Sequence, residues 1–290
     1  MEHAILGAGA VGGLVGTALA SIGEVVTVLV RPERLPNYPA NLSAERPSGT
    51  ITAPTKVVAT LANPVEVLWI ATKTYQLNTA LESVQSLPRN VVPLLNGVDH
   101  AEVLRARFGR DRVLPATIAV EAERIAPGRF VQRSPFVNLN LAASGESPLG
   151  AIVARLRGLE FTCKFIPNEN TLLWSKLCFL GPLALVTSAS GLSKGEVYAD
   201  AEWKRKLISA MTEACAVAKA SGAEVEPAQV QAIYDGLPSG IRSSMQKDLA
   251  AGRPLELDAI GGPIVRGGER YGIDVSTAAA LIAAIRGKSA

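Results

Sequence analysis

The sequence is poor in the residues that metal sites and disulfide frameworks require. Three cysteines (Cys163, Cys178, Cys215) and two histidines (His3, His100) occur in 290 residues. Their spacing matches no zinc-binding pattern, and three widely separated cysteines do not form a disulfide framework. We therefore expect a reduced, cytoplasmic protein with no metal ion.

Charge is also scarce and evenly divided. Charged residues make up 19% of the chain, with 29 Lys and Arg against 26 Asp and Glu, and no five like charges follow one another. A nucleic-acid-binding protein usually carries a basic stripe, so the pattern argues against a nucleic-acid partner. Hydrophobic residues make up 48%, which is enough for a large core and excludes intrinsic disorder. The length predicts two domains.

Residues Ala4–Gly23 are uncharged and long enough to cross a bilayer. Acidic residues flank this run, and no Lys or Arg precedes Arg31, so we expect neither a signal peptide nor a membrane partner. Six of the twenty residues are glycines, and their positions indicate a different explanation.

The run contains a dinucleotide-binding pattern. A predicted strand at His3–Gly7 leads into G-x-G-x-x-G, a helix follows over Leu14–Ile22, and Val25–Val30 predicts a second strand. Strand, glycine loop, helix and strand form the context in which this motif binds a dinucleotide, with helix-terminal amides facing the pyrophosphate. The predicted cofactor contacts of the loop are Gly7, Ala8, Gly9, Ala10, Val11 and Gly12.

The end of the second strand predicts which cofactor binds. Enzymes that use NAD usually have an acidic residue here, whereas this chain has Arg31, 19 residues after Gly12. A planar guanidinium binds a 2′-phosphate through two parallel hydrogen bonds, which favours NADP(H). In the alternative interpretation, Arg31 is a solvated turn residue and Glu33 binds the ribose.

Two polar residues follow predicted parallel strands. Lys73 comes after Val65–Ala71, before a predicted helix at Gln76–Ser86, and Asn96 comes after Val91–Leu95. Because ligands bind at the carboxyl ends of such strands, both are candidates for the nicotinamide end of the site. Alternatively, Lys73 is an exposed loop lysine, and Asn96 with the glycine after it forms an ordinary turn.

The remaining pattern separates two domains. Alternation over Arg129–Leu141 predicts antiparallel strands, Pro148–Gly158 resembles a helix, and Phe161–Ile166 predicts a last strand. Helical patterns then continue to the carboxyl end. We expect a nucleotide-binding α/β domain over residues 1–167 and an all-helical domain over residues 168–290.

An apolar helix in the second domain, with a cap at Asn170-Thr171, contains one lysine. Lys176 is the only cation between Phe165 and Ser193. Its side chain either extends to solvent or lies in a cleft, where desolvation would lower its pKa into the range useful for proton transfer.

For two acidic residues, too, the sequence leaves a functional and a purely structural interpretation open. Glu256 either acts in the site or only favours the dipole of the helix that it begins. Glu213, in an amphipathic helix over Ile208–Ala220, is either a buried polar residue or a surface one.

Taken together, these motifs resemble the ketopantoate reductase (2-dehydropantoate 2-reductase) family over essentially the full chain. The resemblance implies a Rossmann-type domain followed by an all-helical domain, with the active site in the cleft between them. It also implies NADPH-dependent reduction of a 2-oxo acid, foremost ketopantoate in pantothenate biosynthesis, and a homodimer. The motifs that carry it are the glycine loop, Arg31, Lys73, Asn96-Gly97, Trp174-x-Lys176, Ser243-Ser244-Met245-x-x-Asp248 and Gly252-Arg253-x-x-Glu256-x-Asp258.

The resemblance also implies roles for single residues. Lys176 would be the general acid, and Glu256 would orient both the substrate and this lysine. Asn96 and Lys73 would contact cofactor and substrate, and Ser244 would bind the substrate carboxylate.

One departure concerns the substrate. Family members commonly have asparagines four and eight residues after the catalytic lysine, where this chain has Leu180 and Ala184. A site without these amides discriminates less well for a hydroxylated substrate. This leaves two alternatives: a reductase of a less polar 2-oxo acid, as in the related D-2-hydroxy-acid dehydrogenases, and a non-catalytic NADP-binding regulator.

Overall fold

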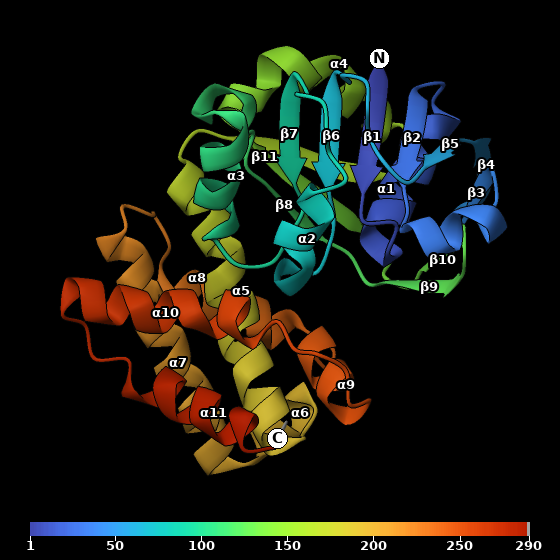
Figure 1. The fold of residues 1–290 in the computed structure, drawn as a ribbon. Helices are drawn as coiled ribbons and strands as arrows, with labels where there is room; N and C mark the ends of the chain where they lie inside the picture. Colours follow the sequence, from blue (N-terminus) through green and yellow to red (C-terminus); the bar gives the residue numbers. More distant parts are fainter. Residues whose placement is uncertain (289–290) are drawn as a thin grey trace. The chain divides into compact units, whose positions relative to one another are not determined.

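The protein, seen here in a computed structural model that describes residues 1–288, contains two compact units (Figure 1). The first unit comprises residues 1–95 and 100–167. The second comprises the short segment 96–99 and the chain from residue 168 onward. The first is an α/β unit and the second is helical, which confirms the expected fold class.

A five-stranded parallel sheet forms the centre of the first unit (Figure 1). Its strands are ordered 3-2-1-4-5 by their place in the chain, which is the order of a Rossmann sheet. The order reverses between β1 and β6, and open parallel sheets bind ligands at such a point. Across the sheet the strands are β5 (Lys56–Val58), β2 (Val25–Leu29), β1 (Glu2–Leu6), β6 (Val67–Ile70) and β7 (Asn90–Pro93).

Helix α1 (Ala10–Ser21) joins β1 to β2 and begins four residues before the predicted start. Nearly all of it is buried. Glycines within it allow close packing, because a Cβ on Gly13 would lie 2.0 Å from the Phe130 ring and one on Gly16 would lie 3.0 Å from Ile5. Tertiary packing therefore outweighs the low helix propensity of glycine. The uncharged run is thus a buried strand, loop and helix.

Two smaller sheets complete the first unit, and the antiparallel strands predicted over Arg129–Leu141 lie one in each of them. Strand β10 pairs with β3 and β9, whereas β11 pairs with β8 and β12. Pro135 lies between them in a four-residue link, and a turn of this kind does not form a tight hairpin. The strands are β3 (Asn41–Arg46), β4 (Gly49–Pro54), β8 (Ala116–Ala119), β9 (Ala122–Ala126), β10 (Arg129–Gln132), β11 (Val137–Ala142) and β12 (Phe161–Ile166).

The helix predicted over Gln76–Ser86 is much shorter in the structure. It consists of a 3-10 turn, η2 (Thr74–Gln76), and one short helix, α2 (Leu77–Leu81). The Arg107 guanidinium donates to the carbonyls of Leu81 and Val84 at 3.2 and 3.1 Å, so these groups are satisfied without a further helical turn. The other helical segments are η1 (Pro32–Asn37), α3 (His100–Phe108), η3 (Arg110–Arg112), η4 (Ala143–Gly145) and α4 (Glu146–Arg157), of which α4 was predicted.

The helical unit is built around α5 (Glu169–Ser190), which packs along α7. Within residues 1–288, α5 is the one helix long and apolar enough to cross a membrane, and 78% of its most apolar stretch is buried in the protein. The other helices are α6 (Lys194–Ala199), α7 (Ala201–Ala220), α8 (Pro227–Gly236), α9 (Ser244–Ala250), α10 (Leu257–Tyr271) and α11 (Ser276–Arg286).

Helix α5 begins at a different cap from the predicted Asn170-Thr171. The Asn168 side chain accepts a hydrogen bond from the Thr171 amide at 2.9 Å, so Asn168 is the N-cap. The helix then continues past Pro182, which lacks an amide for the Cys178 carbonyl. The Tyr234 hydroxyl lies 3.4 Å from that carbonyl and donates at 2.8 Å to the carbonyl of Phe179. This hydroxyl therefore supplies a hydrogen bond to the part of the helix in which the proline removes one.

Glu213 falls between its two alternatives, since it is half-buried. Its carboxylate accepts hydrogen bonds from the amides of Thr277 and Ala278, at 3.0 and 2.8 Å. Glu213 therefore satisfies two amides in the first turn of α11 and complements its helix dipole.

The close approach of α1 to Phe130 predicts opposite effects for one substitution at two sites in the first unit. Gly13→Ala should lower the free energy of unfolding by about 1–3 kcal/mol, because the buried Phe130 ring has no room to move. Gly150→Ala, inside α4 with no atom of the described chain within 4 Å of the new methyl group, should raise it by about 0.4–1 kcal/mol. Urea denaturation measures both, and equal effects would contradict the packing argument.

Candidate functional site

The glycine loop after β1 packs closely against the neighbouring backbone at two of its three glycines. Gly7 has φ +101°, and a Cβ there would lie 2.7 Å from the Thr72 amide nitrogen. A Cβ on Gly12 would lie 2.2 Å from the Gly7 carbonyl oxygen, whereas one on Gly9 would have no neighbour within 4 Å in the described chain. Gly7 and Gly12 are thus required by the fold. Gly9 leaves open space above the loop, and a bound pyrophosphate would use it.

Arg31 and Lys73 lie at the same edge of the parallel sheet as the glycine loop. Arg31 precedes η1 directly after β2, with a side chain 59% exposed and 4.0 Å from the Glu33 carboxylate. Lys73 precedes η2 after β6 and is half-buried. Because Gly7 contacts the backbone at Ala71 and Thr72, the loop and Lys73 are close neighbours.

A further cation near the loop was not predicted. Arg124 of β9 donates to the Ala8 carbonyl at 3.4 Å. Arg124 and Arg34 both act electrostatically on the Tyr38 hydroxyl, whose pKa burial raises. The sequence gives no motif around Arg124, and only the pairing of β9 with β10 brings it to this edge.

In the helical unit, three predicted residues meet. The Lys176 ammonium of α5 donates to the Asn96 amide oxygen at 3.0 Å, and the Asn96 amide nitrogen donates to the Glu256 carboxylate at 3.2 Å. Burial lowers the pKa of Lys176 to about 8, and the Glu256 carboxylate limits the fall. A cation with this pKa is suited to give up a proton near neutral pH.

The segment 96–99 carries Asn96 into this cluster. Gly97 has φ +85°, and a Cβ there would lie 2.3 Å from the Ala259 carbonyl oxygen of α10. Val98 packs against the apolar core of the helical unit. The Asn-Gly pair is therefore a turn with a specific purpose, because only glycine allows the segment to lie this close to α10.

Glu256 comes directly before α10 and is buried, with an exposed fraction of 5%. Within the described chain its carboxylate makes no cap hydrogen bond to α10. It accepts from Asn96 instead, so favouring the helix dipole is not its only contribution.

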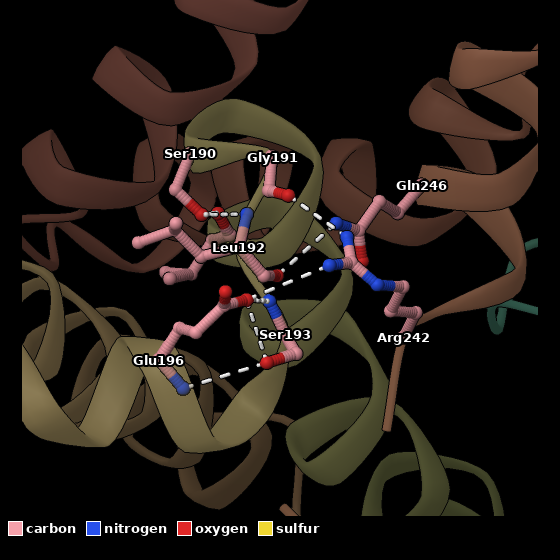
Figure 2. A network of polar contacts seen from close by, with 8 residues as sticks. Ser190, Gly191, Leu192, Ser193, Glu196, Arg242 and Gln246 are labelled. Atoms are coloured by element: carbon pink, nitrogen blue, oxygen red, sulfur yellow. Dashed lines mark hydrogen bonds and ion pairs between the residues drawn. The ribbon is translucent and has the colours of Figure 1, made fainter. Parts of the chain in front are cut away.

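Ser244 is the first residue of α9, and its side chain is exposed. The residue before it, Ser243, caps the helix by accepting from the Gln246 amide at 3.1 Å. The residues two positions before and after Ser244 in the sequence make further hydrogen bonds (Figure 2). Gln246 donates to the Leu192 carbonyl at 3.1 Å, and Arg242 donates to the Gly191 carbonyl at 2.9 Å. The start of α9 is therefore fixed to the end of α5.

Apart from Ser244 at the start of α9, the predicted residues thus fall into two groups. Asn96, Lys176 and Glu256 form one hydrogen-bonded cluster in the helical unit, while the glycine loop, Arg31 and Lys73 share one edge of the parallel sheet. Leu180 and Ala184 follow Lys176 at four-residue intervals on α5, so they lie on the same side of the helix. Leu180 is half-buried and Ala184 is fully buried.

Sequence-family models match both parts of the chain. Residues 3–144 match "Ketopantoate reductase PanE/ApbA" and residues 168–289 match its C-terminal counterpart. A 2-dehydropantoate 2-reductase of Caulobacter vibrioides is 33% identical, over 97% of this chain and 96% of its own length.

Solved structures are similar over the whole chain. A PanE/ApbA family ketopantoate reductase from Ralstonia eutropha JMP134 has a TM-score of 0.88 at 26% identity, covering 100% of this chain and 98% of its own. A D-mandelate dehydrogenase in complex with NADH and anilino(oxo)acetate has a TM-score of 0.86 at 20% identity, with 100% and 98% coverage. At that identity the second likeness shows the fold alone.

The two-unit fold, the two matching family models and the relative in C. vibrioides agree: the chain belongs to the ketopantoate reductase family, whose members are NAD(P)H-dependent oxidoreductases acting on a CH–OH group.

Proposed function

We propose that the protein reduces a 2-oxo acid to a 2-hydroxy acid with NADPH, and that ketopantoate is its first candidate substrate. The observation that carries the proposal is the Lys176 ammonium, hydrogen-bonded to an amide that is itself held by the Glu256 carboxylate, with its pKa lowered to about 8. A reductase of a ketone needs a proton donor of this kind at the carbonyl oxygen.

The residues of the first unit fit a nicotinamide dinucleotide. The loop offers space above Gly9, and Arg31 has an exposed guanidinium for a 2′-phosphate. Arg34 and Arg124 add positive charge around Tyr38, which also favours the extra phosphate of NADPH over NADH. When bound, the cofactor supplies the hydride.

Residues of the helical unit then stabilise the negative charge that develops on the substrate oxygen. The Lys176 ammonium stabilises this oxygen and transfers a proton to it. Asn96 accepts a hydrogen bond from the ammonium and so fixes the direction of its remaining protons. Glu256 holds Asn96 and favours the charged form of the lysine. Lys73 and Ser244 would bind the substrate, with the serine at its carboxylate.

A second candidate substrate class is a less polar 2-oxo acid. Leu180 and Ala184 present no polar group on the side of α5 that carries Lys176, so these two positions cannot hydrogen-bond the hydroxyl of ketopantoate. An apolar substituent would pack against the half-buried Leu180 without leaving a buried donor or acceptor unpaired, whereas Ala184 is fully buried.

The biological setting belongs to the same proposal. With ketopantoate as substrate, the protein would act in pantothenate biosynthesis in the cytoplasm. We also expect a homodimer, since a ketopantoate reductase from Staphylococcus aureus with the same fold is dimeric. Sedimentation of the purified protein measures this state.

A substrate panel is the direct test of the reaction. Purified protein with NADPH should oxidise the cofactor when ketopantoate is added, as nicotinamide absorbance reports. A higher kcat/KM for 2-oxo acids with aliphatic or aromatic substituents would favour the second substrate class. Tight binding of NADPH in calorimetry without turnover of any 2-oxo acid would show a non-catalytic binding protein instead.

Removing the lysine tests the acid. Lys176→Ala should lower kcat by roughly 10²- to 10⁴-fold, the usual effect of losing a general acid. Lys206→Ala removes a half-buried cation of the same unit, 2.6 Å from Glu202, and should leave kcat unchanged. An unaltered rate in Lys176→Ala would remove this residue from the mechanism.

The pKa of Lys176 sets the expected pH dependence. Reduction needs the ammonium, so kcat for reduction should fall as the pH rises through about 8. Oxidation of the 2-hydroxy acid needs the neutral amine, so its kcat should rise over the same range. Initial rates in both directions between pH 6 and 10 measure this, and two profiles with the same slope would contradict the assignment.

Arg31 decides the choice of cofactor. Arg31→Ala should weaken NADPH binding by roughly 10- to 100-fold while NADH binding changes little, because only NADPH has a 2′-phosphate for the guanidinium. Arg89→Ala is the matched control, since Arg89 is another exposed arginine of this unit, 3.6 Å from Glu66. Calorimetric titration with both cofactors measures these affinities, and equal losses for the two would exclude the 2′-phosphate role.

A further inference from the structure

An arginine outside the predicted site is joined to the segment that carries Asn96. Arg266 of α10 donates to the Asp258 carboxylate at 2.8 Å and to the Asp99 carboxylate at 2.5 Å. Asp99 lies only three residues after Asn96. One guanidinium thus joins the far end of segment 96–99 to the helix whose start bears Glu256.

The surface of α10 is shaped for this contact. Asp258, Gly262 and Arg266 follow one another at four-residue intervals and so lie on one side of the helix. A Cβ on Gly262 would lie 2.6 Å from the Arg266 guanidinium and 2.7 Å from the Asp258 carboxylate. The glycine therefore leaves room for both side chains to lie flat against the helix.

We propose that Arg266 is a positioning residue for catalysis: through Asp99 it holds segment 96–99 on α10 and so keeps Asn96 between Lys176 and Glu256. This inference rests on the proposed function of Lys176 as the acid. The segment is attached at both ends, by Asn96 to Glu256 and by Asp99 to Arg266, with Gly97 packed against α10 between them. Loss of one end increases the freedom of the other.

Releasing segment 96–99 should raise the pKa of Lys176. Burial is the main cause of its lowered pKa, and Glu256 is the charged group that acts on it in the described chain. Water that enters as the segment loosens replaces the Asn96 oxygen as acceptor and solvates the ammonium, so the pKa of Lys176 should rise toward its ordinary value of 10.5.

Two variants with opposite charge changes separate this effect from simple electrostatics. Arg266→Ala removes a positive charge and Asp99→Asn removes a negative one, so a long-range effect would move the pKa of Lys176 in opposite directions. Release of the segment moves it upward in both. Arg266→Lys keeps one charged donor and should restore part of the effect, and Lys206→Ala is the control for the loss of a surface cation.

The measurement is a pH titration of the full-length protein labelled with ¹³C at the lysine ε-carbon. The Lys176 signal is identified by its absence in Lys176→Met. We expect its midpoint to move to higher pH by about half a pH unit or more in both Arg266→Ala and Asp99→Asn. No movement, or movement in opposite directions, would overturn the proposal.

Turnover supplies the second readout. At pH 7 both variants should lose about three- to tenfold in kcat with an unchanged KM for NADPH, because the ammonium is misdirected while the cofactor loop is untouched. An unchanged kcat would also count against Arg266. If the wild-type protein turns over no 2-oxo acid, the proposed function fails, and the titration, which needs no substrate, still decides whether Arg266 positions Asn96.

Discussion

The half-buried ammonium of Lys176 is the group on which polar contacts of the helical unit converge: burial lowers its pKa, and Asn96 accepts a hydrogen bond from it. Helix α5 is apolar and mostly buried, so the lysine has few ways to be solvated from its own helix. Its partners come from distant parts of the chain: Asn96 lies 80 residues before it and Glu256 lies 80 residues after it. The site exists only when α5, α10 and segment 96–99 are packed together.

Glycines make this packing possible in both units. Gly7 and Gly12 bring the nucleotide loop close to the backbone after β6, and Gly97 brings its segment close to α10. Gly97 is needed for close packing and not for flexibility. A Cβ there would lie 2.3 Å from the Ala259 carbonyl oxygen, so a larger residue would push the segment away from α10. Leu180 and Ala184 lie one and two turns beyond the lysine on α5 and take no part in its hydrogen bond to Asn96.

The sequence predicts the central strands well and the surrounding structure poorly. Buried parallel strands are continuous apolar runs, so β1, β2, β6 and β7 lie within about two residues of their predicted bounds. Alternation over Arg129–Leu141 predicts the two strands there but not their partners, because most of these, β3, β8 and β12, lie far away in the chain. The site shows the same limit. Motifs indicate Lys176, Asn96 and Glu256, but not the hydrogen bonds between them, nor Arg266 and Arg124, which no motif marks.

The lysine also weakens the fold that holds it. Its pKa is about 8 in the folded protein and 10.5 in an unfolded chain, so the folded state disfavours the ammonium. This cost to stability is fully present below pH 8 and disappears as the pH rises toward 10.5, because the unfolded chain binds the proton more tightly throughout that range. An apolar residue at this position would avoid the cost and complete the apolar surface of α5. That a lysine stands there, hydrogen-bonded to Asn96 and within reach of the Glu256 charge, is the strongest physical reason to propose this cluster as a site for proton transfer.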